Sequence, residues 1–271
     1  MTTAEAESAE AAFLADTATG LPIPGEPVFA TAAETRRHRK QRLAAALRLF
    51  GKYGFGEGIS GHISVRDPEF PDRFWVNPFG VSFKHVKVSD LICVDGTGRV
   101  VEGKHRINPS AFVIHSAIHD LNPGATAAAH GHTAHSRALG SLGRLLEPID
   151  QESAAFYGRQ VLYGEYEGPS VSVDLGKDIA RKLGDNRAIL LQHHGLITVG
   201  GSLDEAVHWF FTYDSCAQVQ LLAYAAGTPK TFTHEQAVAA GAGFGDEQLG
   251  WFSFQLLWDE IVAEQPDFLD E

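Results

Sequence analysis

Cysteine is scarce in this sequence, and long apolar runs are missing. Only two of the 271 residues are cysteines, Cys93 and Cys216. Two cysteines cannot form a disulfide-rich scaffold or a zinc module built mainly from thiolates. No apolar run approaches the roughly 18–20 residues of a membrane span, and the first residues lack the basic and apolar pattern of a signal peptide. We therefore expect a cytoplasmic protein with no membrane partner.

Basic residues are missing from both ends of the chain. Residues 1–35 contain six acidic side chains and residues 245–271 contain eight, and neither segment has a lysine or arginine. The 20 acidic and 22 basic side chains between these segments nearly balance, so the net charge of −12 resides at the ends. We expect no nucleic-acid partner, because a continuous basic surface is missing, and acidic ends favour solubility.

The remaining composition is that of a globular protein whose helices and strands are mixed. Hydrophobic residues make up 44% of the chain, which is enough for one large α/β domain. Hydrophobic periodicity and helix stop signals predict helices at Thr35–Tyr53, Pro109–Leu121, around Gln151–Tyr157, Leu175–Leu183 and Leu203–Ala226. Strands are predicted at His62–Arg66, Phe74–Asn77, Leu91–Val94, Arg99–Val101, Ala125–His130, Ala188–Leu191 and Ile197–Val199. The order lacks strict βαβ alternation, which favours a layered sheet flanked by helices. We divide the chain into an N-terminal arm (1–34), a central domain (35–230) and a helical, aromatic C-terminal extension (231–271).

One glycine-rich motif matches a dinucleotide-binding pattern but lies in the wrong context. Gly56-Glu57-Gly58-Ile59-Ser60-Gly61 has the spacing G-x-G-x-x-G. Phosphate binding by that motif requires the glycines to follow a strand and to open a helix. Here they follow a predicted helix and lead into a strand, so we expect no nicotinamide or flavin cofactor.

Histidine carries the main functional signal. Three of the 13 histidines fall in one stretch, Ala129-His130-Gly131-His132-Thr133-Ala134-His135. Side chains two residues apart at the end of a strand point to the same side, so His130 and His132 can converge on one ion. Neutral imidazole suits zinc, iron, nickel or copper, and three such ligands leave a position open for water or substrate. A hydrogen-bonded pair without metal remains the alternative.

A third ligand has to come from another part of the chain. The stretch Leu190-Leu191-Gln192-His193-His194-Gly195 places two histidines where an apolar strand ends. Adjacent side chains on an extended chain diverge, so only one of His193 and His194 is expected to join the site. His115 and His119 are a rival pair at helical spacing, but no glutamate lies between them as in H-E-x-x-H. We expect that pair to make packing and polar contacts.

Several further motifs occur in an order that is typical of one family. They are Gly61-His62-Ile63-Ser64, Asn77-Pro78-Phe79-Gly80, Val100-Val101-Glu102-Gly103, the His-x-His at 130 and 132, and His194-Gly195. Together they resemble the class II aldolase/adducin family, which includes fuculose-phosphate aldolase and ribulose-5-phosphate 4-epimerase. The resemblance runs from about Arg36 to Thr228, some three-quarters of the chain.

The resemblance implies a fold, an assembly and a metal site. It implies a three-layer α/β/α domain with a mixed, largely antiparallel sheet, and a homotetramer with active sites near the subunit interfaces. It selects His130, His132 and His194 as ligands of one divalent ion per subunit, with zinc as the first candidate and iron or manganese as alternatives. By the same likeness, the residues that bind a small-molecule substrate are Gly61, His62, Ser64, Asn77, Gly80 and Ser110.

The sequence departs from the family pattern at the proton-transfer residue and at the phosphate site. In the aldolases a glutamate four residues before a helix histidine moves the proton; Ala111, ahead of His115, takes its place here. His62 replaces an asparagine, Phe79 a threonine and Pro109 a serine. Each lost charge-assisted contact costs a phosphorylated substrate roughly 1.5–3 kcal/mol. The chain thus resembles a divergent member that lacks the catalytic glutamate.

Three functions are compatible with these departures. The first is a divalent-metal-dependent carbon–carbon lyase, of aldolase or decarboxylase type, acting on a non-phosphorylated small molecule. The second is a non-haem iron oxygenase that oxidatively decarboxylates an aromatic 2-oxo acid, as some family members in aminocoumarin antibiotic pathways do. The third is a non-catalytic module like the adducin head domain, against which the three retained histidines argue.

Because the glutamate is missing, another residue has to be sought as the proton donor. The family's aldolases carry a tyrosine downstream of the histidine pair that protonates the product across a subunit interface. Tyr157 is the nearest tyrosine in that region, and Glu152 is the local acid. We predict both as catalytic candidates. The alternatives are that Tyr157 only caps a buried helix with its hydroxyl and that Glu152 is simply exposed.

Overall fold

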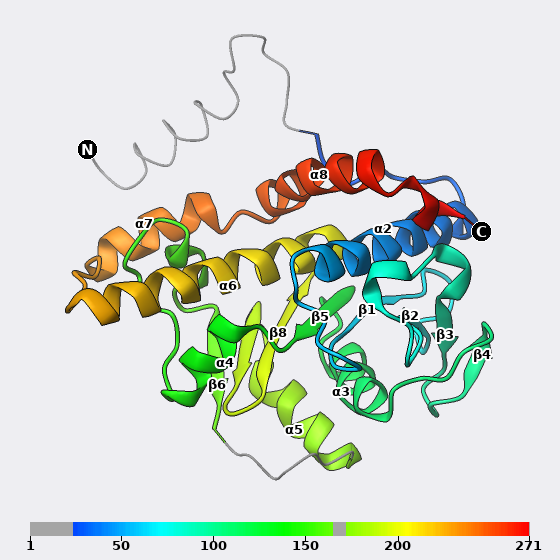
Figure 1. Ribbon diagram of the computed structural model, residues 1–271, viewed down its shortest axis with the longest axis horizontal. Helices are drawn as coiled ribbons and strands as arrows, with labels where there is room; N and C mark the ends of the chain where they lie inside the picture. Colours follow the sequence, from blue (N-terminus) through cyan, green and yellow to red (C-terminus); the bar gives the residue numbers. More distant parts are fainter. Residues whose placement is uncertain (1–23, 165–171, 271) are drawn as a thin grey trace.

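The computed structural model describes residues 24–164 and 172–270 of the chain. Within these ranges eight strands form one sheet in the order β4-β3-β2-β1-β5-β8-β7-β6, and helices cover both of its faces (Figure 1). Neighbouring strands are antiparallel, except that β6 and β7 run parallel. The predicted three-layer α/β/α fold with a mixed, largely antiparallel sheet is confirmed.

The elements follow one another along the chain with strands and helices interspersed. The strands are β1 (His62–Arg66), β2 (Phe74–Val76), β3 (Ile92–Val94), β4 (Val100–Glu102), β5 (Ala127–Gly131), β6 (Gln160–Tyr163), β7 (Ala188–Leu191) and β8 (Gly195–Gly200). The helices are α2 (Ala32–Lys52), α3 (Pro109–Leu121), α4 (Ala134–Ser141), α5 (Val173–Leu183), α6 (Leu203–Ala226), α7 (His234–Phe244) and α8 (Glu247–Glu264). Short 3-10 turns are η1 (Phe83–His85), η2 (Val88–Asp90), η3 (Ser153–Phe156) and η4 (Pro266–Leu269). None of these helices is long and apolar enough to cross a bilayer.

Two elements differ from the predictions for local reasons. Helix α2 begins before the predicted Thr35, because Thr31 and Glu34 form a reciprocal capping box that starts the helix. The helix predicted around Gln151–Tyr157 is wrong, since only the 3-10 turn η3 forms there. Ser153 Oγ accepts from the backbone N–H of Asp150, and Asp150 Oδ1 accepts from Ser153 N–H, so local side-chain bonds replace helical ones.

Helices α2, α6 and α8 cover one face of the sheet and enclose the larger core. Its fully buried side chains include Leu47 and Phe50 from α2, Trp209 and Phe210 from α6, and Phe254 from α8. Helix α8 packs against both α2 and α6. The aromatic C-terminal segment therefore docks on the body of the same chain, where it contributes directly to the core (Figure 1).

Helices α3 and α5 cover the opposite face, and the second core lies beneath them. Ile114 and Ile118 of α3 pack there with Ile179 of α5. Strand β1 alternates between the two faces, as a pleated strand must. Ile63 and Val65 enter the larger core, whereas His62 and Ser64 point to the α3 side. A polar layer therefore lies between β1 and α3.

A buried carboxylate joins α2 to the β1–β2 hairpin. Asp67 accepts hydrogen bonds from Arg36 Nε at 2.7 Å and from Trp75 Nε1 at 2.9 Å. Burial by itself raises the pKa of this carboxyl group. The hydrogen bonds from Arg36, Trp75 and the backbone N–H groups of Glu69 and Phe70 outweigh burial and hold the pKa well below its ordinary value. Asp67 is thus ionised wherever the fold is intact near neutral pH.

Candidate metal centre

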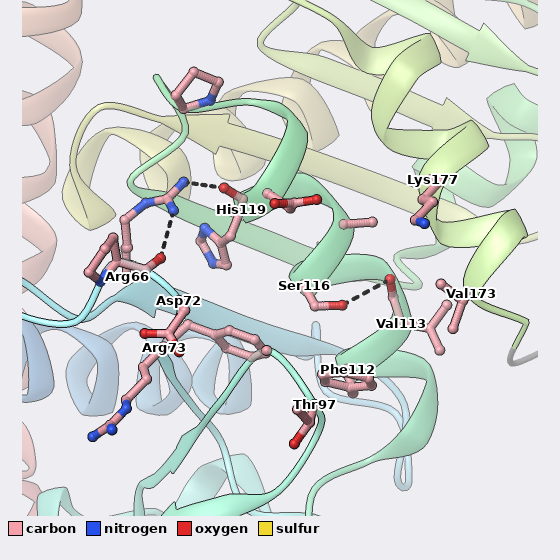
Figure 2. A pocket seen from close by; sticks show the side chains of 16 residues that line it. Arg66, Asp72, Arg73, Thr97, Phe112, Val113, Ser116, His119, Val173 and Lys177 are labelled. Carbon is pink, nitrogen blue, oxygen red and sulfur yellow. Dashed lines mark hydrogen bonds between the residues drawn. The ribbon is translucent and has the colours of Figure 1, made fainter.

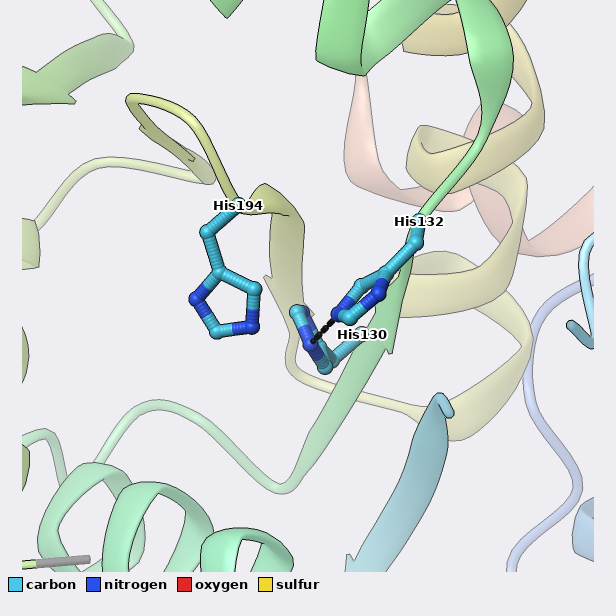
Figure 3. A group of neighbouring side chains, drawn as sticks. All are labelled: His130, His132 and His194. Atoms are coloured by element: carbon cyan, nitrogen blue, oxygen red, sulfur yellow. Dashed lines mark hydrogen bonds between the residues drawn. The ribbon is translucent and has the colours of Figure 1, made fainter. Parts of the chain in front are cut away.

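Three histidine side chains converge where β5 ends and β8 begins (Figure 3). His130 lies in β5, His132 directly follows that strand, and His194 directly precedes β8. One nitrogen from each ring lies within 4.8 Å of the other two, and the Nε2 atoms of His130 and His132 are 3.0 Å apart. Nitrogens about 2.0–2.1 Å from a tetrahedral zinc ion lie roughly 3.3 Å from one another. The spacing therefore suits a divalent ion.

The protonation of these rings also fits a metal. His130 Nδ1 lies 2.9 Å from Leu196 O, and because a carbonyl can only accept, this nitrogen is the donor. The other nitrogen of the neutral ring, Nε2, then carries a lone pair. Burial lowers the pKa of His130 well below its ordinary value, lowers that of His132, and lowers that of His194 to about 4. Neutral imidazole is the form that binds metal ions.

The turn between β7 and β8 decides which of its two histidines joins the group. His193 has a positive φ of 60° and is exposed, so the chain reverses direction at that residue. His194 follows, with its N–H donating to Leu191 O at 3.1 Å, and its ring lies 4.9 Å from that of His130. The structure therefore brings together the three histidines that the family resemblance selects, and leaves His193 outside. Their role as metal ligands stays a prediction.

Glycine is required at 195 because the site is closely packed there. A Cβ atom at this position would lie 2.6 Å from Gly131 O and 2.9 Å from His132 Cδ2. These distances are shorter than ordinary contacts between such atoms. The absence of a side chain at Gly195 lets β8 approach β5 closely enough for His194 to reach the other two histidines.

Two residues predicted to bind substrate, His62 and Ser64, lie in the polar layer beside this group. The His62 ring packs against the His130 ring with centroids 4.6 Å apart, and His62 Nδ1 lies 2.6 Å from His115 Nε2. Ser64 Oγ forms a short hydrogen bond with His115 Nδ1 and lies 2.8 Å from His119 Nε2. The polar contacts expected for His115 and His119 are confirmed. Sequence reasoning missed their connection to His62, although the i, i+4 and i, i+2 spacings of these residues were visible.

The other residues predicted to bind substrate occupy different surroundings. Gly61 has a φ of +88°, and a Cβ there would lie 3.3 Å from His130 O, so it borders the histidine group. Asn77 is buried and its Oδ1 accepts from Ile63 N–H at 3.1 Å. Gly80 is exposed, and Ser110 lies in the first turn of α3. Their substrate-binding roles stay predictions.

Tyr157 and Glu152 lie around η3, which packs against α7. Tyr157 is 37% exposed, and its hydroxyl lies 3.1 Å from His234 Nδ1. Glu152 is exposed and accepts from Gln151 Nε2 at 3.2 Å. Within the described residues, no hydrogen bond or ring contact joins either side chain to the three histidines of the same chain. Their catalytic role stays a prediction that needs the partner across a subunit interface.

Ala111 occupies the position of the missing glutamate, on the first turn of α3. Its side chain is almost fully buried, one helical turn ahead of His115 and therefore on the same face of α3. Within the described residues, the one group of side chains that could hold a metal ion consists of three histidines and contains no carboxylate. The site thus offers neutral nitrogen donors but no acidic side chain for proton transfer at this position.

Comparison with known proteins gives matches over most of the chain. Residues 41–221 match the family described as Class II Aldolase and Adducin N-terminal domain. Decarboxylase NovR of Streptomyces niveus is 42% identical over 243 residues, which cover 89% of this chain and 90% of the relative. A protein of Streptomyces roseochromogenus subsp. oscitans, named 4-hydroxy-3-prenylphenylpyruvate oxygenase/4-hydroxy-3-prenylbenzoate synthase, is also 42% identical and covers 89% of this chain and 88% of the relative.

A solved structure has the same fold over nearly the whole chain. The L-fuculose 1-phosphate aldolase from Glaciozyma antarctica PI12 aligns with a TM-score of 0.85 and 40% sequence identity. The alignment covers 90% of this chain and 97% of that one. The similarity therefore extends over most of the length of both chains.

Proposed function

Because this chain belongs to the class II aldolase and adducin family, we propose that it is a divalent-metal-dependent carbon–carbon lyase acting on a non-phosphorylated small molecule. Among lyase reactions we favour decarboxylation. The observation that carries the proposal is the convergence of His130, His132 and His194 as neutral donors, with Ala111 in place of an acidic residue. Zinc is the first candidate for the ion, with iron and manganese as alternatives.

The chemistry follows from which groups can move a proton and which cannot. A divalent ion held by the three histidines would supply a Lewis acid for the carbonyl oxygen of the substrate. Aldol cleavage also requires a positioned general base, and alanine at position 111 cannot act as one. Decarboxylation of a 3-oxo acid needs no proton abstraction from carbon, because the departing CO2 leaves its bonding electrons on the substrate. The lack of a carboxylate at Ala111 is therefore compatible with decarboxylation.

The name of one relative supports this choice. NovR, at 42% identity, is named a decarboxylase. His62, Phe79 and Pro109 replace residues that would contact a phosphate, which argues for a non-phosphorylated substrate. The likeness to an L-fuculose 1-phosphate aldolase supports the lyase class but not, given these replacements, that protein's substrate.

An oxygenase is the second candidate. The Streptomyces roseochromogenus relative is named an oxygenase of a prenylated phenylpyruvate, a 2-oxo acid. Three neutral histidines with open coordination positions would also suit Fe(II). In that reaction O2 is consumed as the 2-oxo acid loses CO2, so O2 uptake separates the two candidates.

Elemental analysis of protein purified under low oxygen tests the metal site. We expect about one divalent ion per subunit in the wild type and its loss in His130→Ala, His132→Ala and His194→Ala. His193→Asn is the matched control, because residue 193 lies in the same turn but outside the group and asparagine tolerates its positive φ. Metal retained by all three alanine variants would overturn the proposal.

The reaction class is tested by measuring CO2 release and O2 uptake together. The metal-loaded protein is incubated with non-phosphorylated 3-oxo acids and with aromatic 2-oxo acids. CO2 release without O2 uptake supports the lyase, and CO2 release with equivalent O2 uptake supports the oxygenase. No turnover of any of these acids, combined with cleavage of sugar phosphates, would contradict both.

We also propose that the protein is a cytoplasmic homotetramer. The support is family membership, since the resemblance implies tetramers with active sites near subunit interfaces. This assembly would allow Tyr157 or Glu152 to approach the histidines of a neighbouring subunit. Light scattering at working concentrations measures the mass of the assembly. If the protein is a monomer, neither Tyr157 nor Glu152 of a neighbouring subunit can be the proton donor.

A further inference from the structure

The polar layer between β1 and α3 forms one continuous chain of hydrogen bonds. It runs from Ala125 O through His119, Ser64 and His115 to the ring of His62. All four side chains are at least 95% buried. The chain ends beside His130, one of the three histidines of the candidate metal centre, and its other end adjoins a surface cavity of about 720 Å³ lined by His119 (Figure 2).

The backbone at the cavity end determines the direction of the first bonds. Ala125 O lies 3.2 Å from His119 Nδ1, and a carbonyl oxygen can only accept, so His119 Nδ1 carries the proton. Arg66 Nη2 donates to His119 O at 2.6 Å (Figure 2). The same nitrogen donates to Ala125 O at 3.3 Å, and the two bonds hold this backbone in place. In a neutral ring His119 Nε2 is then an acceptor, so Ser64 Oγ–H must donate to it.

The remaining bonds follow from this direction. Ser64 has a single hydroxyl proton, and because His119 takes it, Ser64 Oγ accepts from His115 Nδ1–H. His115 Nε2 therefore carries a lone pair and accepts from His62 Nδ1–H. The other ring nitrogen of His62, Nε2, therefore carries no proton and has a lone pair that can accept a hydrogen bond. The carbonyl of Ala125 thus decides the tautomer of a ring three side chains away.

The surroundings of the three histidine rings keep them neutral and so preserve this arrangement of protons. Among the described residues, no carboxylate forms a hydrogen bond or ring contact with His62, His115 or His119, so no negative charge in contact with these rings balances an added proton. Burial lowers the pKa of His115 to about 3 and that of His119 well below its ordinary value. The hydrogen bond of the His62 ring within the described residues is at Nδ1, which leaves Nε2 as an acceptor for a ligand or water.

We propose that His62 is a specificity-determining residue. The chain of hydrogen bonds fixes its Nε2 atom as an acceptor, and the substrate group that lies beside His130 is therefore a hydroxyl and not a phosphate. The proposal rests on the proposed function, since it assumes that substrate binds at the three histidines. A lone pair on Nε2 attracts an O–H donor, whereas it repels the oxygens of a phosphate or carboxylate. An asparagine at this position could instead turn its NH2 group toward an anion. The replacement at residue 62 therefore changes the recognised group from anion to hydroxyl.

Neutron diffraction from crystals of the full-length, deuterium-exchanged protein tests the proton order without any metal or substrate. We expect deuterium on His62 Nδ1 and none on Nε2. In Ser64→Ala the chain of hydrogen bonds is interrupted, and deuterium should divide between the two nitrogens of His62. Ser116→Ala, on helix α3 next to His115 but outside the hydrogen-bond chain, should keep the wild-type pattern. Deuterium on Nε2 in the wild type overturns the proposal even if Ser64→Ala fails to fold, and an unchanged pattern in Ser64→Ala also overturns it.

Calorimetry on the zinc-loaded protein tests the recognised group with two probes. Glycolohydroxamate chelates a divalent ion and carries a free hydroxyl, and phosphoglycolohydroxamate carries a phosphate in its place. We expect the wild type to bind the hydroxyl probe at least tenfold more tightly and His62→Asn to reduce this preference by tenfold or more. Equal binding of both probes, or a preference for the phosphate probe, would overturn the specificity proposal. If the protein holds no zinc and binds neither probe, the proposed function fails, while the neutron result still decides whether His62 is an acceptor.

Discussion

A single added methyl group at position 195 should disrupt the candidate metal centre. In Gly195→Ala the new Cβ would lie 2.6 Å from Gly131 O, whereas carbon–oxygen contacts are ordinarily about 3.3–3.6 Å. The strands would have to separate locally by roughly 0.7 Å or more to restore that contact. The second contact, 2.9 Å to His132 Cδ2, would push one of the three rings away from the others.

The size of the effect follows from the cost of overpacking. Extra carbon atoms in a closely packed interior typically cost about 1–3 kcal/mol. For a protein of this size each kcal/mol lowers Tm by roughly 2–4 °C, so we expect a loss of roughly 2–12 °C. Displacement of supporting groups around a metal typically weakens binding about 10–100-fold, and we expect at least that for a displaced ligand.

Two measurements on the same protein preparations test this reasoning. Thermal unfolding of metal-free protein gives the packing cost, and competition with a chromogenic chelator gives the zinc affinity. Gly124→Ala is the matched control, because a Cβ at 124 would meet no atom within 4 Å. If Gly195→Ala matched Gly124→Ala in both Tm and zinc affinity, the close approach of β8 to β5 could not be what forms the site.

Further predictions concern the pH dependence of stability, the C-terminal helices and the proton donor. The pKa of Asp67 is depressed in the fold, so its contribution to stability is present above its unfolded pKa of about 3.9 and is lost as the pH falls below that value. Urea unfolding at pH 7 and pH 3 should therefore show Asp67→Asn costing about 2 kcal/mol or more at pH 7 and much less at pH 3. Phe254→Ala should cost about 3–5 kcal/mol by the same assay, because the side chain is fully buried in the larger core; a cost below 1 kcal/mol would mean that α8 is not part of that core. If Tyr157 or Glu152 moves the proton, Tyr157→Phe or Glu152→Gln should lower turnover about a hundredfold or more with metal content unchanged, and normal turnover in both variants would exclude them.

Helix ends were predicted correctly for α3 and α6, whereas the caps that start α2 and α5 were overlooked. Helix α3 has its predicted bounds because Asn108 caps it, Pro109 occupies its first position, and Asn122 ends it. Two elements were missed. Helix α4 starts at Ala134, within the stretch that we interpreted only as a source of ligands, and β6 is a half-buried edge strand with little alternation. Their positions depend on packing against elements distant in sequence.

The candidate site was predictable in part. The i, i+2 spacing of His130 and His132 follows directly from strand geometry. The choice of His194 over His193 came from the family resemblance, because the reversal of the chain at a left-handed residue cannot be read from two adjacent histidines. The contact between His62 and His115 depends on the register of β1 against β5 and on the placement of α3 above them. No local pattern contains that information.

The three histidines come from two segments about sixty residues apart, and this separation has a consequence for the life of the protein in the cell. An ion shared by His130, His132 and His194 would cross-link the central strand β5 to the β7–β8 turn. Free metal at a thousand times its dissociation constant stabilises a fold by about 4 kcal/mol. A difference of that size shifts the unfolded fraction by roughly a thousandfold, and unfolded molecules are the ones that proteases remove. Metal supply would then set how long each molecule survives as well as whether it can act.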